Sequence, residues 1–313
     1  MKLMKPAFWD YKKPNFLSYL LIPFTFPIIV NNYLLNLKKN KIKKKNIKSI
    51  CIGNIYVGGT GKTPLSIKIF QILHKLNFKT ATIKKFYKKQ SDEQKLLANK
   101  TKLYCLKSRN EALNRAFEDG VEIAVFDDGL QDGSINYDLK FVCFNNLKWI
   151  GNGFLIPAGP LREKIENISK YDAVFLNGNE ENNDDLKKII RRYDSNIKIF
   201  ETYYEPNNLN KFNNNEKFLV FSGIGNPDSF KRTLIRNKLN IIEELNFPDH
   251  YLYTTSDIDK IKSHAKKLNA KILTTEKDYI KIDPSYIDGI DFLGIDLIIK
   301  NEDELINFIK SKI

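Results

Sequence analysis

The sequence predicts an α/β protein built from parallel strands and helices. Short apolar runs of strand length recur along the chain, and stretches with apolar residues at helical spacing separate several of them. A glycine-rich turn follows one early apolar run and leads directly into a helical pattern. Because strands connected through helices usually pair in parallel, this alternation predicts sheets that are covered on both faces.

The expected elements fall into two groups, separated by an asparagine-rich stretch at residues 207–215 that reads as a loop. In the first group, strands are expected at residues 49–52, 80–83, 102–106, 121–126, 139–144 and 173–176, and helices at residues 65–76, 108–118 and 184–193. In the second group, strands are expected at residues 218–221, 241–245 and 272–274, and helices at residues 227–239, 256–268 and from residue 303.

The chain is therefore expected to have three parts, since 313 residues are enough for two α/β domains. Residues 1–47 form an N-terminal segment. Residues 48–206 form a larger domain, and residues 207–313 form a smaller α/β domain that closes the active-site cleft.

The formal net charge of +14 favours anionic partners such as phosphates, nucleic acid or acidic lipid. A lysine- and asparagine-rich composition without such a partner explains the same charge. The cysteines are odd in number, lie in apolar runs and lack metal-ligand spacing, so we expect reduced core residues in a cytoplasmic protein. They are Cys51, Cys105 and Cys143.

Residues 16–37 are unusually apolar, but Pro23 and Pro27 interrupt them. The uninterrupted stretch is shorter than the ~20 residues that cross a bilayer, and a lysine-rich run follows at residues 38–48. This pattern favours a peripheral or monotopic helix in the membrane interface, on the anionic cytoplasmic side. The alternative is a helix that packs on the protein's own core, followed by solvated lysines.

The glycine-rich turn has the context of a phosphate-binding P-loop, because it follows a strand and opens a helix. Its backbone N–H groups would contact phosphate oxygens. Lys62 would neutralise charge that develops on the transferred phosphate, and the Thr63 hydroxyl would bind Mg²⁺. The general pattern has glycine where this chain has Tyr56. The predicted nucleotide contacts in this segment are Tyr56, Val57, Gly58, Gly59, Thr60, Gly61, Lys62 and Thr63.

A second apolar strand, at residues 121–126, runs directly into Asp127 and Asp128. Each carboxylate on its own could be a turn residue. Together with the upstream P-loop they predict a metal-binding role, which makes the first domain P-loop NTPase-like.

Several segments, in this order and spacing, resemble the tetraacyldisaccharide 4′-kinase family, the lipid A 4′-kinases of Gram-negative bacteria. The Pro-Ala-Gly-Pro-Leu-Arg-Glu sequence at residues 157–163 is the most specific of them. The others are residues 53–64, 127–131, 151–153, 222–227, 247–250 and 275–278.

This resemblance implies that ATP, with Mg²⁺, phosphorylates the 4′-hydroxyl of a tetraacylated glucosamine disaccharide 1-phosphate. The product would be the 1,4′-bisphosphate of lipid A biosynthesis, formed at the cytoplasmic face of the bacterial inner membrane. No nucleic acid and no obligate protein partner are expected. The alternative is a membrane-associated P-loop ATPase of other function, such as a switch or a partitioning-type ATPase.

The resemblance also implies roles for individual residues. Asp92 looks like the catalytic aspartate and His250 like its partner, although Asp92 alone would read as a helix-start carboxylate and His250 as a turn residue. Gln131 and Arg162 match positions of the family that contact the nucleotide. Positions around the metal are matched by Thr63, Asp127, Asp128 and Glu163. Substrate contacts are expected at Arg109 and Asp132.

Three departures from the family pattern are visible. Asp132 stands where the family usually has histidine. Residues 84–88 read Lys-Lys-Phe-Tyr-Lys where Ser-Arg-Gly-Tyr-Gly is usual, and Ser91 and Gln94 replace the glycine and proline that flank the Asp92-Glu93 pair. These changes concern the surroundings of the predicted catalytic aspartate.

Overall fold

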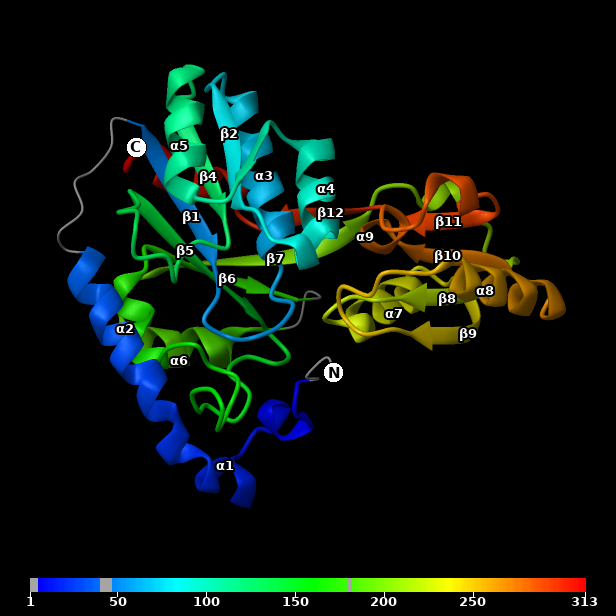
Figure 1. The fold of residues 1–313 in the computed structure, drawn as a ribbon, viewed down its shortest axis with the longest axis horizontal. Coiled ribbons are helices and arrows are strands. Elements are labelled where there is room, and N and C mark those ends of the chain that lie inside the picture. Colours follow the sequence, from blue (N-terminus) through cyan, green and yellow to red (C-terminus); the bar gives the residue numbers. More distant parts are fainter. Residues whose placement is uncertain (1–4, 40–46, 179–181) are drawn as a thin grey trace. The chain divides into compact units, whose positions relative to one another are not determined.

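The computed structural model describes residues 5–39, 47–178 and 182–313. Most of the lysine-rich run that follows the apolar N-terminus, residues 40–46, lies outside these ranges. The chain divides into two compact units (Figure 1), a larger one formed by Met1–Phe86, Thr101–Tyr203 and Ile299–Ile313 and a smaller one formed by Tyr87–Lys100 and Tyr204–Ile298.

An eight-stranded sheet, in the order β12-β7-β6-β5-β1-β4-β2-β3, organises the larger unit. Every neighbouring pair from β7 to β3 is parallel, as the alternation of strands and helices predicts. The strands are β1 (Lys48–Gly53), β2 (Thr80–Lys85), β3 (Leu103–Leu106), β4 (Ile123–Asp127), β5 (Leu139–Asn145), β6 (Ala173–Asn177), β7 (Lys198–Pro206) and β12 (Ile295–Ile299).

Helices pack on this sheet through apolar faces. In α3 (Lys62–Lys75), Leu65, Ile69 and Leu73 recur every four residues and are buried. Other helices of the larger unit are α5 (Arg109–Glu118), α6 (Asp184–Tyr193) and α10 (Glu302–Lys310). The resulting core includes buried side chains from β1, β4, β5 and β6, so the central strands are covered on both faces.

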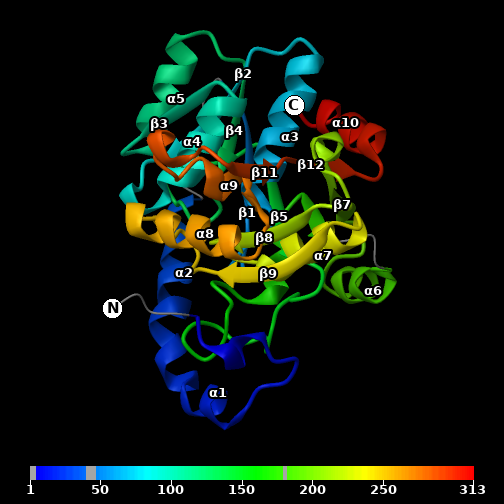
Figure 2. The same cartoon turned by 90° about the vertical axis from the view of Figure 1, so that its right-hand side faces the viewer.

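The C-terminal helix α10 belongs to the larger unit, which differs from the expected domain at residues 207–313. Aromatic packing explains the return of the chain, because the ring of Phe308 lies 6.4 Å from that of Phe141 and 6.2 Å from that of Phe200. Lys68 of α3 also forms a 2.7 Å ion pair with Glu302. Figure 2 shows α10 next to α3.

The smaller unit contains a four-stranded parallel sheet in the order β11-β10-β8-β9. Alternate residues of β8 face opposite sides, so Phe218 packs with side chains of α7 and Phe221 with side chains of α8. The elements are β8 (Lys217–Ser222), α7 (Pro227–Arg236), β9 (Asn240–Asn246), α8 (Thr255–Lys267), β10 (Lys271–Thr275), α9 (Glu276–Tyr279) and β11 (Ile290–Leu293).

Helix α4 (Ser91–Lys100) also belongs to the smaller unit, although its sequence lies within the expected first domain. It packs against α9. Lys100 forms a 2.6 Å ion pair with Glu276, and Lys95 donates a hydrogen bond to the carbonyl of Ile280. These contacts place Asp92, at the start of α4, in the smaller unit.

The apolar N-terminus folds as a series of short helices that belong to the larger unit: η1 (Ala7–Asp10), α1 (Phe16–Leu20), η2 (Ile22–Thr25) and α2 (Phe26–Lys39). Both prolines that interrupt the apolar run lie in the first turn of a helix, where a missing N–H costs little. In the described part of the chain, no helix has the length and apolarity needed to cross a membrane.

Candidate active site

The P-loop connects β1 to α3, and Gly61 adopts the left-handed conformation (φ +85°) directly before the helix begins. Tyr56 is buried against Leu155 and Leu161, and its hydroxyl reaches the N-terminal segment. Its hydroxyl hydrogen-bonds with Asp10 and Lys5, and the Lys5 ammonium lies 4.3 Å from the centre of its ring. The tyrosine in place of the usual glycine therefore links the start of the chain to the P-loop.

Asp127, at the end of β4, holds the start of α3. Its carboxylate accepts hydrogen bonds from the hydroxyls of Thr63, at 3.0 Å, and Ser66, at 3.1 Å. The ammonium of Lys84 on β2 lies 2.6 Å from the same carboxylate. Because Asp127 is 0% exposed and Lys84 1% exposed, this ion pair is fully buried. Asp127 thus fixes the Thr63 hydroxyl, which is the predicted metal ligand.

Asp128 offers the other predicted carboxylate, and its backbone is left-handed (φ +60°). Its Oδ1 atom is buried without a hydrogen-bond partner, 4.0 Å from the Lys62 ammonium and 3.5 Å from the Arg162 guanidinium. Burial alone would raise the pKa of Asp128, but the charges of Lys62 and Arg162 outweigh it and lower that pKa. The carboxylate therefore stays ionised and has an oxygen available for a cation.

In the ranges that the structure describes, no group of three or more His, Cys, Asp or Glu side chains is arranged to hold a metal ion. Magnesium seldom needs such a group, since it keeps several waters and binds one or two carboxylates together with substrate phosphates. The Thr63 hydroxyl and the Asp128 Oδ1 atom, which accepts no hydrogen bond, fit this requirement.

Three further predicted residues join in one hydrogen-bond network. Gln131 donates to the Asn54 carbonyl, at 2.9 Å, and to Glu163, at 3.3 Å, and it accepts from Arg162 at 3.1 Å. The Tyr171 hydroxyl donates to Glu163 at 2.6 Å. Because Arg162 also faces Asp128, which lies 4.0 Å from the Lys62 ammonium, the network connects Glu163 to the carboxylate beside the P-loop lysine.

The two predicted substrate contacts, Arg109 and Asp132, form an ion pair with each other at 2.9 Å. Arg109 also donates to the backbone carbonyl of Asp128, and Ser134 holds Asp132 through its backbone and its hydroxyl. The carboxylate that replaces the usual histidine is thus balanced by Arg109. A direct contact of either residue with substrate stays a prediction.

In the smaller unit, the structure brings Asp92 and His250 together. The Nδ1 atom of His250 lies 3.0 and 2.9 Å from the two carboxylate oxygens of Asp92. His250 has a left-handed backbone (φ +57°), and its N–H donates to the Asp249 carboxylate at 3.0 Å. Histidine is one of the non-glycine residues that adopt this conformation more often than most.

Lys277 of α9 completes this cluster, with its ammonium 3.3 Å from Asp92. Burial alone would raise the pKa of Asp92, but the hydrogen bond from His250 and the charge of Lys277 outweigh it and hold that pKa far below its usual value. The Asp92 carboxylate is therefore ionised at neutral pH.

The match to a family of known proteins extends over nearly the whole chain. A family model described as tetraacyldisaccharide-1-P 4′-kinase matches residues 16–313. The chain belongs to this family. The resemblance inferred from the sequence motifs is thereby confirmed.

Relatives of this kinase cover almost its full length. The tetraacyldisaccharide 4′-kinase of Pelagibacter ubique (strain HTCC1062) is 50% identical over 308 residues, which make up 98% of this chain and 97% of that protein. The enzyme of the same name from Rickettsia akari (strain Hartford) is 33% identical over 322 residues, 97% and 96% of the two chains.

A crystal structure of LpxK from Aquifex aeolicus, described as an "apo" form in complex with ATP, has the same fold as this kinase. It superimposes with a TM-score of 0.71 at 22% identity and covers 94% of this chain and 99% of that one. The predicted α/β fold class is confirmed.

Sequence reasoning gave no role to Lys84 or Lys277, which contact the predicted functional carboxylates of the kinase. Each of the two lysines can be noticed in the sequence. Lys84 directly follows the expected strand at residues 80–83, and Lys277 lies in the Thr-Glu-Lys-Asp motif at residues 275–278. Pairing of β2 with β4, which aligns Ile83 with Phe126, brings Lys84 beside Asp127, and no pattern within either strand reveals that pairing.

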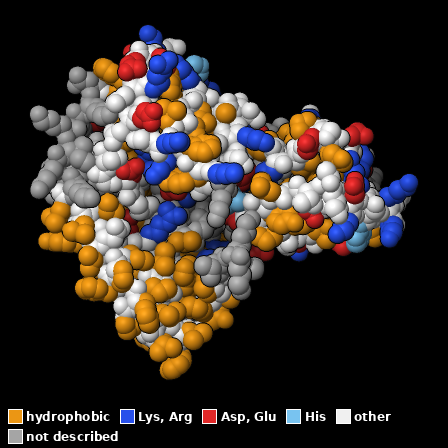
Figure 3. All heavy atoms as spheres, viewed as in Figure 1, with side chains coloured by type: hydrophobic (Ala, Val, Ile, Leu, Met, Phe, Trp, Pro, Cys, Tyr) orange, Lys and Arg blue, Asp and Glu red, His pale blue; other side chains and the backbone are white. Residues whose placement is uncertain are grey.

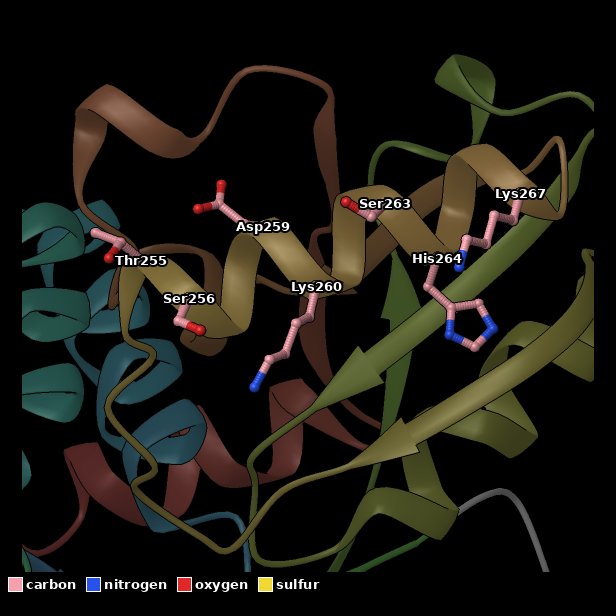
Figure 4. Close-up of a pocket in the computed structure, with 7 residues that line it drawn as sticks. All are labelled: Thr255, Ser256, Asp259, Lys260, Ser263, His264 and Lys267. Atoms are coloured by element: carbon pink, nitrogen blue, oxygen red, sulfur yellow. The ribbon is translucent and has the colours of Figure 1, made fainter.

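A surface hollow of about 570 Å³ on the smaller unit of the kinase contains none of the predicted site residues (Figure 4). It is lined by one helix, α8, through Thr255, Ser256, Asp259, Lys260, Ser263, His264 and Lys267. His264 forms a 2.8 Å ion pair with Glu243 and is partly exposed.

Proposed function

We propose that this protein transfers the γ-phosphate of ATP to the 4′-hydroxyl of an acylated glucosamine disaccharide 1-phosphate. The observation that carries the proposal is membership of the 4′-kinase family over residues 16–313. The geometry of the larger unit supports it, because a P-loop lysine, an oriented threonine hydroxyl and an available carboxylate oxygen are the parts that phosphoryl transfer requires.

ATP would bind with its phosphates on the P-loop. The backbone N–H groups before α3 would hold the phosphate oxygens, and Lys62 would neutralise charge on the transferred group. Magnesium, when bound, supplies charge neutralisation between the β- and γ-phosphates. Thr63 and Asp128 would hold the ion, with Asp127 fixing the threonine hydroxyl and Glu163 connected through the Gln131 and Arg162 network.

Asp92 and His250 would act on the sugar hydroxyl. An ionised carboxylate can accept a hydrogen bond from the attacking hydroxyl and then its proton as the new bond forms. The imidazole of His250, hydrogen-bonded to both oxygens of Asp92, would orient the carboxylate and share the proton. The 4′-hydroxyl oxygen forms the new P–O bond, and ADP carries away the electrons of the broken one.

The lipid substrate would be met at an anionic membrane surface on the cytoplasmic side. Figure 3 shows hydrophobic side chains gathered over α1 and α2, where Phe16 is 80% exposed, Phe26 67% and Tyr33 64%. Soluble proteins seldom expose so continuous an apolar surface without a binding partner. This surface, the apolar N-terminal face, consists of Phe16, Leu17, Tyr19, Leu20, Ile22, Phe24, Phe26, Ile29, Val30, Tyr33, Leu34 and Leu37.

A peripheral arrangement suits this face, since its helices are short and interrupted, and Asn32 in α2 turns inward to donate a 2.8 Å hydrogen bond to the Arg162 carbonyl. One side of α2 therefore contacts the protein while the exposed side chains of the apolar N-terminal face are available to lipid.

The experiment is transfer of γ-labelled phosphate from ATP to a defined tetraacyldisaccharide 1-phosphate in mixed micelles, with the Lys62→Ala variant as the control. We expect labelled lipid from the wild type and almost none from the variant. ATP hydrolysis that leaves the lipid unlabelled would instead identify an ATPase of other function.

A further inference from the structure

The Thr-Glu-Lys-Asp motif at residues 275–278 forms the junction between β10 and α9, and two of its residues have a clear structural task. The Thr275 hydroxyl accepts a hydrogen bond from the Asp278 N–H at 3.0 Å and caps the helix. The fully buried Asp278 carboxylate accepts from the Gly223 N–H at 3.0 Å and forms a 2.5 Å ion pair with Lys281. The backbone at Lys277 is therefore held firmly in place.

Lys277 itself points at carboxylates from two other segments of the smaller unit. Its ammonium lies 3.3 Å from Asp92 and 3.8 Å from Glu93, both on α4, and 3.4 Å from Asp249, which precedes His250. Burial lowers the pKa of Lys277, but the charges of Asp249, Glu93 and Asp92 outweigh it and raise that pKa, so the side chain stays cationic. A single ammonium thus offsets the repulsion among three carboxylates.

We propose that Lys277 is a positioning residue for phosphoryl transfer, whose ammonium holds the Asp92 carboxylate in the orientation in which it meets His250 and the sugar hydroxyl. The proposal rests on the proposed function. Lys277 contacts Asp92 and does not need to touch substrate. Its charge keeps Asp92 ionised and draws α4 and the His250 loop to a common point.

A purely structural role is the competing explanation, and a neighbouring ion pair allows a direct comparison. Lys100 and Glu276 also join α4 to α9, at 2.6 Å, but neither contacts Asp92 or His250 in the structure. If Lys277 served only to attach the two helices, loss of either lysine should have similar consequences.

The test compares Lys277→Met, Lys277→Arg and Lys100→Met with the wild type in the lipid-phosphorylation assay. We expect Lys277→Met to lower kcat by about 10- to 100-fold, the effect of misplacing a reacting group by about 1 Å, while the KM for ATP changes little. Lys277→Arg, which restores the charge, should recover most of the loss. Lys100→Met should change kcat by less than about 5-fold, since a partly exposed ion pair contributes little.

The pH profile supplies a readout that a structural role would not move. His250 from the loop after β9 and Lys277 from α9 contact Asp92, and the carboxylates of Glu93 and Asp249 lie beside the same two side chains. Loss of the Lys277 charge removes one cause of the low Asp92 pKa. The acid limb of kcat in Lys277→Met should therefore lie at higher pH than in the wild type and in Lys100→Met.

Equal kcat values and equal pH profiles for Lys277→Met and Lys100→Met, in samples with matching thermal unfolding, would overturn the proposal. Failure of the wild type to label the lipid at all would instead refute the proposed function, so the two failures are distinguishable. An inactive Lys277→Arg variant with a wild-type unfolding temperature would also contradict a role based on charge.

Discussion

Replacement of Asp127 by asparagine should destabilise the protein strongly, because it leaves the Lys84 ammonium buried without the carboxylate 2.6 Å away. At that distance, with an effective dielectric constant of about 20, Coulomb's law gives an attraction of about 6 kcal/mol. Breaking a buried pair typically costs about 3–5 kcal/mol of unfolding free energy. At about 2–4 °C per kcal/mol for a unit of this size, the melting temperature should fall by about 6–20 °C.

A double variant separates the stability of this pair from its function. Replacing both partners by apolar residues, as in Lys84→Met with Asp127→Leu, removes both buried charges and should restore most of the lost stability. It also removes the acceptor that holds the Thr63 hydroxyl at 3.0 Å. The double variant should therefore be folded and close to inactive.

Differential scanning calorimetry and the lipid-phosphorylation assay measure the two effects independently. An Asp127→Asn variant that unfolds within about 1 kcal/mol of the wild type would show that the buried pair does not matter for folding, since surface pairs contribute no more than this. Substantial activity in the stable double variant would show that Asp127 is not needed to orient Thr63, and either result would refute the reasoning.

Three other variants test the remaining parts of the site. Lys62→Ala should lower turnover by about 10²-fold or more in a folded protein, because the cation near the transferred phosphate is lost; near-normal turnover would exclude the P-loop assignment. Asp92→Ala and His250→Ala should each lower kcat, and their double variant should cost less than the sum of the two free energies if the residues act together; full additivity would contradict this. Phe26→Ser should weaken co-sedimentation with anionic vesicles, whereas Phe117→Ser, at a 52% exposed site outside the apolar N-terminal face, should not; equal binding by both would contradict membrane contact through that face.

The sequence was most informative where function depends on neighbouring residues. A P-loop is formed by one short segment, so Lys62 and Thr63 could be recognised from glycine spacing and the flanking strand and helix. The end of an apolar strand similarly identified Asp127 and Asp128. The pairing of Asp92 with His250 came only from family resemblance, because no local pattern joins residues so distant along the chain.

Tertiary packing decided the features that the sequence did not reveal. Helix α4 joins the smaller unit through α9, and α10 returns to the larger unit through Phe308, although both lie on the other side of the expected boundary. Lys84 and Lys277 became recognisable as site residues only when strand pairing and helix packing placed them against carboxylates. Propensity and periodicity describe single elements and do not specify such contacts.

The attachment of the N-terminal segment to the P-loop has a practical consequence for protein production. Truncating the chain from its N-terminus through α2, to obtain a sample without detergent, would also remove Asp10, the hydrogen-bond partner of the buried Tyr56 hydroxyl. An unsatisfied buried polar group costs about 1–3 kcal/mol of unfolding free energy. The truncation would remove as well the Trp9 indole that donates to the Pro157 carbonyl at 3.0 Å. A more soluble version should keep the entire backbone and exchange exposed side chains such as Phe16 and Tyr33 for polar ones. Crystallisation and kinetics would then be done on an enzyme with its phosphate-binding loop intact.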